Sequence, residues 1–258
     1  MNPTGRVEYA ADLAKPLVDK VALVTGGTRG IGKAIAQKLA SLGASVGICG
    51  RNEEQLLRTA HEFERGGVRV HTQKADVSRN SDVTALVQAT EKKLGPISIL
   101  VNNAGIGLFG PAHEQSEEDW DRVMDTNLKS VFLVTCAVAP GMIARKSGDI
   151  INISSLAGKN TFAGGALYCA SKWGLQGLTG CMAEDLRWSG IRVSTICPGS
   201  VATEYSGRGP KDPSKVLTAE DVAHAVAMVV TQGPQSFLSE VDLRPVGKPG
   251  TSKGGGSQ

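Results

Sequence analysis

Residues 20–32 read KVALVTGGTRGIG, from Lys20 to Gly32. The apolar run that opens this stretch has the pattern of a strand buried on both faces. Glycines follow at Gly26, Gly30 and Gly32, and residues 33–42 then carry apolar side chains at helical spacing. A strand, a glycine-rich turn and a helix in this order are typical of a parallel α/β sheet.

Strands and helices alternate along the rest of the chain. Pro140 and Gly141 fall within the longest predicted helix, 117–146, where they predict a kink or an end. Thr218 and Asp221 form a capping-box pattern before the last helix. Further strands are expected at 45–49, 68–73, 97–101, 149–153, 191–197 and 239–243, and further helices at 53–65, 81–94, 165–188 and 222–230. This alternation predicts right-handed βαβ units and a parallel sheet with helices on both faces.

The composition limits the class of protein. Of 258 residues, 41% are hydrophobic and 21% are charged, which suits a globular chain with a substantial core. A net charge of +3 and an aromatic content of 4% argue against a nucleic-acid partner. No run approaches the roughly 18 apolar residues that a membrane span needs. Five scattered cysteines without a Cys-x-x-Cys pair predict neither a disulfide framework nor a zinc site.

The chain divides into three parts. Residues 1–19 are expected to form an N-terminal extension, and they lack the apolar stretch of a signal peptide, so a cytoplasmic location is the expectation. Residues 20–245 show no change of composition and are predicted to form one domain. Residues 246–258 are rich in glycine and serine, which predicts a flexible tail.

The glycine turn lies where a dinucleotide would bind. Ligands of an open parallel sheet lie beyond the carboxyl ends of its strands, and a helix N-terminus there offers N–H groups and partial positive charge to a phosphate. The spacing of Gly26, Gly30 and Gly32 differs from the commoner G-x-G-x-x-G fingerprint, and an ordinary glycine-rich turn is the alternative. Its position between a strand and a helix favours the dinucleotide site.

The end of the second strand indicates which dinucleotide. Chains that prefer NAD usually carry an acid there for the ribose 2′-hydroxyl. This chain has Gly50, Arg51 and Asn52 instead, and Arg29 lies in the glycine turn. Arginines suit a 2′-phosphate, so NADP is favoured over NAD; two solvated surface arginines are the alternative.

Tyr168 and Lys172 lie four residues apart in a predicted helix, which places both side chains on one face. A cation beside a phenol favours the phenolate and lowers the pKa of the phenol from about 10. Such a tyrosine can give and take a proton. Alone, the pair also occurs by chance on many helices.

Taken together, these motifs resemble the short-chain dehydrogenase/reductase family over about residues 20–245. Within the family, the 3-oxoacyl-carrier-protein reductase type is the most similar. The matching segments are Thr25-Gly26-x-x-x-Gly30-x-Gly32, Asn102-Asn103-Ala104-Gly105, Asn127, Ser155, Tyr168-x-x-x-Lys172 and Pro198-Gly199. The resemblance implies a Rossmann-type doubly wound sheet of about seven strands in the order 3-2-1-4-5-6-7.

The resemblance also assigns roles to four side chains. Tyr168 would donate the proton, or accept it from an alcohol, and Lys172 would favour its phenolate and bind the nicotinamide ribose. Ser155, rather than its neighbour Ser154, would donate a hydrogen bond to the substrate oxygen. Asn127 would position a water that links Lys172 to solvent. Taken singly, Ser155 and Asn127 have a plain alternative as a loop serine and a helix asparagine.

The cofactor contacts follow by position in the family pattern. Asp76 and Val77 resemble the adenine-binding pair, and Thr203 has the alternative of capping a short helix. The complete expected set is Gly26, Thr28, Arg29, Gly30, Ile31, Gly32, Arg51, Asn52, Asp76, Val77, Asn103, Ala104, Gly105, Tyr168, Lys172, Pro198, Gly199, Val201 and Thr203.

Three functions are consistent with these residues. The first is an NADPH-dependent carbonyl reductase acting on a ketoacyl or related substrate. The second is an NAD-dependent alcohol dehydrogenase of the same family, and the third is a binding protein that senses NADPH without turnover. The substrate pocket is expected to include Ile106, Leu108, Phe109 and Phe162, which suggests a partly apolar small molecule.

Metals and partners complete the expectations. His61, His71, His113 and His224 are far apart in the sequence and predict no metal site. The family commonly forms tetramers through its two long helices, here 117–146 and 165–188. A homotetramer or homodimer is therefore expected, without a nucleic-acid or membrane partner.

Overall fold

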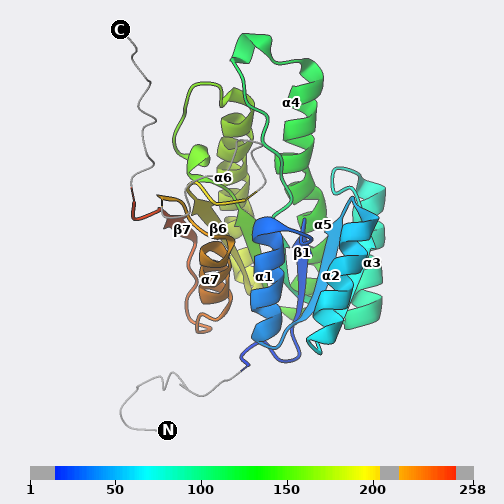
Figure 1. The fold of residues 1–258 in the computed structure, drawn as a ribbon. Helices are drawn as coiled ribbons and strands as arrows, with labels where there is room; N and C mark the ends of the chain where they lie inside the picture. Colours follow the sequence, from blue (N-terminus) through cyan, green and yellow to red (C-terminus); the bar gives the residue numbers. More distant parts are fainter. Residues whose placement is uncertain (1–14, 204–214, 248–258) are drawn as a thin grey trace.

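The computed structural model of the protein describes residues 15–203 and 215–247 (Figure 1). Most of the predicted extension and tail, and the loop 204–214, lie outside the described residues. The end of the extension packs against the domain, because Leu17 is buried and its backbone N–H donates to the carbonyl of Leu42 at 2.9 Å.

Seven parallel strands form one sheet in the order β3-β2-β1-β4-β5-β6-β7, which confirms the predicted topology. The chain runs outward from β1 to one edge, returns to pair β4 with β1, and continues to the other edge. The carboxyl ends of β1 and β4 therefore flank the point where the strand order reverses, which is where such sheets bind ligands. The strands are β1 (Val21–Thr25), β2 (Ser45–Gly50), β3 (Val70–Lys74), β4 (Ile97–Asn102), β5 (Gly148–Ile153), β6 (Ile191–Pro198) and β7 (Glu240–Leu243).

Helices cover both faces of the sheet (Figure 1). One face is packed by α1 (Gly30–Ser41), α2 (Glu53–Arg65) and α7 (Ala219–Val230). The other is packed by α3 (Asn80–Leu94), α5 (Ser130–Arg145) and α6 (Ala166–Leu186).

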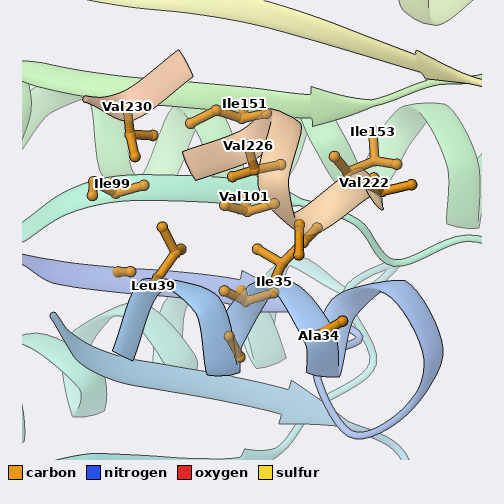
Figure 2. Packing of buried hydrophobic residues seen from close by; sticks show 14 of the residues in the cluster. Ala34, Ile35, Leu39, Ile99, Val101, Ile151, Ile153, Val222, Val226 and Val230 are labelled. Atoms are coloured by element: carbon orange, nitrogen blue, oxygen red, sulfur yellow. The ribbon is translucent and has the colours of Figure 1, made fainter. Parts of the chain in front are cut away.

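The five central strands send alternate side chains into two separate cores, as the pleat of a strand requires. On β4, Ile99 and Val101 join the core beneath α1 and α7, whereas Leu100 points into the other. Figure 2 shows the first core, where Leu39 of α1 and Val226 of α7 close over the strands. Burying one such side chain contributes about 1.5–3 kcal/mol, so this packing fixes α1 and its N-terminus relative to the sheet.

The ends of the elements differ from the sequence expectation by one to three residues. Helix α2 has its predicted bounds, and the capping box of Thr218 and Asp221 at α7 is confirmed. Helix α1 begins at Gly30 rather than at residue 33, so the last glycines of the turn already belong to the first turn of the helix. Helix α7 likewise begins at Ala219, directly after its cap.

The long helix predicted over 117–146 is divided differently from the expectation. Helix α4 (Glu117–Met124) passes through a π-helical turn, η2 (Asp125–Lys129), into α5. Pro140 lies inside α5, which continues to Arg145, so of the two predicted outcomes the end at Pro140 is wrong and the kink stays a prediction. Pro140 and Cys136 both lie on the exposed side of the helix, where water can satisfy the Cys136 carbonyl that a proline leaves unpaired.

This helical stretch, Glu117–Arg145, is long and apolar enough to cross a membrane by length and composition. The expectation that no segment is so apolar is wrong in this respect. Several apolar side chains of this stretch pack inside the protein. Val131, Val134, Val138 and Met142 are buried, and the last three belong to the core between the sheet and helices α3, α5 and α6. A buried core helix and a membrane span share this composition.

Candidate active site

A cavity of about 1080 Å³ lies at the carboxyl ends of the strands. Every residue that the sequence predicted to bind the cofactor lines it, from the glycine turn to Thr203. Ser155, Tyr168 and Lys172 line it as well, whereas Asn127 does not. The structure thus brings segments that are distant along the chain around one space.

The glycine turn can hold a diphosphate. Gly26 has φ +64° and Gly30 has φ +51°, a left-handed region that favours glycine. A Cβ on Gly32 would lie 2.3 Å from the carbonyl oxygen of Gly26, so only glycine fits there. The N-cap residue of α1, Arg29, makes no side-chain capping hydrogen bond within the described residues, whereas Thr218 caps α7, so the first N–H groups of α1 can face a ligand in the cavity. These features fit a nicotinamide dinucleotide.

Hydrogen bonds between the glycine turn and the residues after β4 hold the turn in place. The hydroxyl of Thr25 accepts from the backbone N–H groups of Asn103 and Ala104, both at 3.0 Å. The amide of Asn103 donates to the carbonyls of Thr25 at 2.9 Å and Gly26 at 3.2 Å. The side chain of Asn103 therefore shapes the turn, and its contact with the cofactor stays a prediction. The hydrogen bonds that the Thr25 hydroxyl accepts from Asn103 and Ala104 were not predicted, although Thr25 belongs to the turn motif.

The other end of the cavity is lined by the loops after β2 and β3. Arg51 is exposed there and Asp76 is partly buried. Burial alone would raise the pKa of Asp76, but hydrogen bonds from Ser78 and the charges of Arg51 and Arg79 hold it below its ordinary value. Asp76 is therefore ionised at neutral pH, and Arg51 lies close enough to act on it.

Asn52 has a structural role in addition to the predicted one. Its side chain caps α2 by accepting from the backbone N–H of Gln55 at 2.9 Å. Gln55, in the first turn of that helix, lines the cavity and was not predicted. Its signal in the sequence was its place three residues after a helix cap.

The side chain of Lys172 is buried next to the ring of Tyr168. Its ammonium donates to the carbonyl of Ile153 at 2.9 Å and lies 5.8 Å from the centre of the Tyr168 ring. Burial lowers the pKa of Lys172 from 10.5 to about 8, and the neighbouring Cys197 has a smaller, opposite effect. Both side chains project from α6 one turn apart, as predicted.

The two serines after β5 differ in their surroundings. The Ser155 hydroxyl accepts from the N–H of Ala157 at 3.1 Å and donates to the carbonyl of Pro198 at 3.4 Å, a long contact that a substrate oxygen could replace. The Ser154 hydroxyl is buried, with no hydrogen-bond partner within the described ranges. Both line the cavity, and only Ser155 has a hydroxyl already held in place.

Asn127 lies in the π-helical turn and connects three segments. Its Oδ1 accepts from the N–H of Ile106 at 2.7 Å, and its amide donates to the carbonyl of Ile106 at 2.9 Å and to the Ser171 hydroxyl at 3.0 Å. Ser171 in turn donates to the carbonyl of Tyr168 at 2.8 Å. Asn127 is buried and holds the Tyr168 turn against the loop after β4. The water predicted beside it stays a prediction.

One group of possible metal ligands was not anticipated. Cys197, Glu240 and Asp242 bring their ligand atoms within 4.8 Å of one another. The ammonium of Lys159 forms ion pairs with both carboxylates, at 2.6 Å to Asp242. Burial, the largest effect, raises the pKa of the Cys197 thiol, which disfavours the thiolate that a metal requires. We assign this group to an ion pair between β7 and the loop after β5.

The predicted substrate pocket is formed with one exception. Ile106, Phe109 and Phe162 line the cavity, and Leu108 does not. Asn160 and Thr161, in the loop 158–165 that also carries the predicted Phe162, line it as well, and so does Thr126, which was not predicted. The loops that carry them are visible in the sequence, but the direction of each side chain depends on tertiary packing.

The glycine turn lies where the strand order of the sheet reverses, and it shares one cavity with a serine, a tyrosine and a buried lysine. This combination defines the class of NAD(P)-dependent oxidoreductases with a Rossmann-type fold. The sequence matches the family model for short chain dehydrogenase over residues 20–213. The chain belongs to the short-chain dehydrogenase family.

Similar proteins are consistent with this assignment. A ketoacyl reductase attributed to the granaticin polyketide synthase of Streptomyces violaceoruber is 45% identical over 197 residues, 76% of this chain and 71% of that protein. A metagenomic short-chain oxidoreductase solved with NADP is 43% identical, with a TM-score of 0.81 over 91% of this chain and all of that one. A variant of actinorhodin polyketide ketoreductase solved with NADPH is 33% identical, with a TM-score of 0.81 over 90% and 98%.

Proposed function

We propose that the protein is an NADPH-dependent carbonyl reductase that acts on a ketoacyl compound or a related ketone. The observation that carries the proposal is that Ser155, Tyr168 and Lys172 line the same cavity as the glycine turn. Two similar proteins bear names of ketoacyl or polyketide ketoreductases, which supports this substrate class.

The preference for NADP rests on charge. The loop after β2 presents Arg51 to the cavity and has no acid before Glu53, and Arg29 lines the cavity from the glycine turn. Arginine pairs with a 2′-phosphate through charge-assisted hydrogen bonds. Two similar structures contain NADP or NADPH, in agreement with this preference.

The residues of the chain would divide the chemistry as follows. Bound NADPH supplies the hydride that reaches the carbonyl carbon. Ser155 donates a hydrogen bond to the carbonyl oxygen and stabilises the negative charge that develops there. Tyr168 donates its phenolic proton to that oxygen, which yields the alcohol. The Lys172 ammonium stabilises the phenolate that Tyr168 becomes until a proton returns from solvent.

A substrate panel tests this function. Purified protein is mixed with NADPH or NADH and with β-ketoesters, diketones and quinones, and the loss of nicotinamide absorbance is measured. We expect NADPH oxidation with at least one ketone and its loss in Tyr168→Phe. Oxidation of an alcohol with NAD in preference would support the dehydrogenase of the same family. If the protein binds NADPH tightly but turns over no carbonyl compound, the sensor hypothesis replaces the enzyme.

We further propose that the protein forms homotetramers or homodimers through the long helices. Trp120 of α4, Phe132 of α5 and Trp173 of α6 are 44%, 49% and 50% exposed, which is unusual for large apolar side chains. Analytical ultracentrifugation of wild type and Phe132→Glu tests the interface. We expect a larger assembly for wild type and dissociation in the variant, and a monomeric wild type would contradict the proposal.

A further inference from the structure

Three aromatic rings meet at one side of the cavity. The ring of Phe109 lies between the other two, with its centre 5.5 Å from that of Tyr168 and 6.0 Å from that of Phe162. The interplanar angles of 60° and 41° are those of tilted rings rather than parallel stacks. All three residues line the cavity, and Phe162 is still 44% exposed. An aromatic surface is thus offered beside the proton donor.

The two loops that carry the phenylalanines are joined. The backbone N–H of Gly110 donates to the carbonyl of Gly164 at 2.9 Å, which ties the loop after β4 to the loop before α6. Gly164 has φ +75°, and a Cβ on Gly165 would lie 2.6 Å from the ring of Phe162. Gly165 therefore provides the space in which that ring lies. The Phe162 ring thus lies against Gly165 on one side and has Phe109 as its ring neighbour.

The charged residues lie elsewhere in the cavity. Within the described ranges, the charged side chains that line it are Arg29, Arg51, Asp76 and Lys172. The first three belong to the glycine turn and the loops after β2 and β3, and Lys172 is buried and bonded to a backbone carbonyl. The other residues that line the cavity include the uncharged Ile106, Thr126, Leu156, Asn160 and Thr161. A carboxylate on the substrate would find no counter-charge among them.

We propose that the group Phe109, Phe162 and Tyr168 selects uncharged ketones that carry a flat aromatic ring a few bonds from the carbonyl. This inference rests on the proposed reductase function and narrows its substrate class. A ring added to the group gains a further edge-to-face or offset contact that a saturated ring of equal size cannot make. It also covers the exposed part of Phe162.

Three matched compounds separate ring shape from apolar area and charge. The probes are ethyl 2-oxo-4-phenylbutanoate, ethyl 2-oxo-4-cyclohexylbutanoate and free 2-oxo-4-phenylbutanoate. With NADPH, we expect kcat/KM for the phenyl ester to exceed that for the cyclohexyl ester by roughly 2- to 10-fold. The free acid should be reduced at least about 10-fold less well than its ester, because placing its carboxylate beside apolar rings costs desolvation free energy.

Phe162→Leu is the informative variant, because it removes the ring and keeps an apolar side chain. It should bring the phenyl-to-cyclohexyl ratio close to one while the cyclohexyl ester is still reduced. Phe237→Leu is the matched control, since Phe237 is partly buried and does not line the cavity, and its ratio should equal that of wild type. A wild-type ratio near one, or a Phe162→Leu ratio equal to that of wild type, overturns the proposal.

Binding gives a second readout that does not require turnover. Calorimetric titration of both esters into protein with NADP⁺ should show the same ratio of affinities and the same loss in Phe162→Leu. If the ratio appears in binding but no ketone consumes NADPH, the reductase function fails and ring selection stands. If ketones are reduced but the affinities are equal, ring selection fails and the reductase function stands.

Discussion

The Lys172 ammonium lies 5.8 Å from the centre of the Tyr168 ring while it donates to the Ile153 carbonyl at 2.9 Å. A single carbonyl and a nearby ring compensate only part of the cost of burying a charge. Burial accordingly lowers the pKa of Lys172 to about 8, so its ionisation falls within a range that enzyme assays can reach. The charge that Tyr168 depends on is therefore pH-sensitive.

This pKa predicts how reduction depends on pH. A lysine side chain is charged below its pKa. The favourable charge of Lys172 is therefore present at pH 7 and is lost as the pH rises through about 8. We expect kcat/KM for NADPH, which reports the free enzyme, to fall above about pH 8. Lys172→Arg provides the control, because guanidinium stays charged and any residual activity should not show this decline. A wild-type profile that is flat to pH 10 would contradict the assignment.

The two serines after β5 should differ sharply in activity. Removing the hydroxyl of Ser155 takes away the hydrogen bond to the developing oxyanion, and we expect kcat to fall about 10²- to 10³-fold in Ser155→Ala. The Ser154 hydroxyl has no partner within the described ranges, so Ser154→Ala should change kcat by less than about 3-fold. Steady-state kinetics of both variants check this. Equal losses, or a larger loss for Ser154→Ala, would show that the wrong serine has been assigned.

The bonds of Asn127 predict a loss of both stability and activity. Asn127→Ala removes three hydrogen bonds and leaves the N–H of the partly buried Ile106 without its acceptor. We expect the free energy of unfolding to fall by about 2–4 kcal/mol. Ser171→Ala removes only one of these bonds and should cost about 1 kcal/mol. Urea unfolding measures both, and kcat should fall further than KM rises in Asn127→Ala if the asparagine positions Tyr168.

Much of this site follows from local sequence. The glycine turn, the Tyr168–Lys172 spacing and the cap of α7 are patterns of a few residues, and the structure contains all three. Strand order followed from the family resemblance, and it is confirmed. Here the residues that act together are neighbours along the chain or occupy equivalent strand ends.

What the sequence did not reveal depends on packing between distant segments. The π-helical turn at Asn127 has no local signal, because its extra residue is stabilised by bonds to Ile106 and Ser171. Pro140 predicted an end that α5 does not have, since its exposed side tolerates one missing N–H. Leu108 has the same character as its neighbours, and only the course of the loop keeps it out of the cavity.

Cofactor preference depends on Arg51 in this proposal. Arg51→Ala should weaken NADPH binding by about 10-fold, the lower end expected for a hydrogen bond to a charged group at an exposed site. NADH lacks the 2′-phosphate, so its affinity should change by less than about 2-fold. Fluorescence titration with both cofactors gives the ratio, and raised salt should diminish the difference. Equal weakening of both cofactors would assign Arg51 to the fold instead.

Far from the cavity, Arg192 and Asp149 tie β6 to β5 at the amino end of the sheet. Two guanidinium nitrogens donate to the carboxylate at 2.6 and 3.0 Å, and a third contact reaches the carbonyl of Gln232 at 3.1 Å. Burial, the largest effect, raises the pKa of Asp149 in spite of Arg192. The hydrogen bonds and charge of Arg192, together with the charge of Lys20, oppose this effect and favour the carboxylate.

Arg192→Met leaves a buried carboxylate without its partner, which we expect to lower the free energy of unfolding by about 3–5 kcal/mol at pH 7. Asp149→Asn in the same chain should restore part of this stability, because the charge is removed with its partner. The matched control is Lys129→Met, which breaks an exposed pair with Asp125 at 3.1 Å and should cost no more than about 0.5 kcal/mol. Urea unfolding of the three variants and of the wild-type protein measures these differences. A loss in Arg192→Met as small as in the control would mean that solvent compensates Asp149, and that the pair contributes little to holding β5 and β6 together.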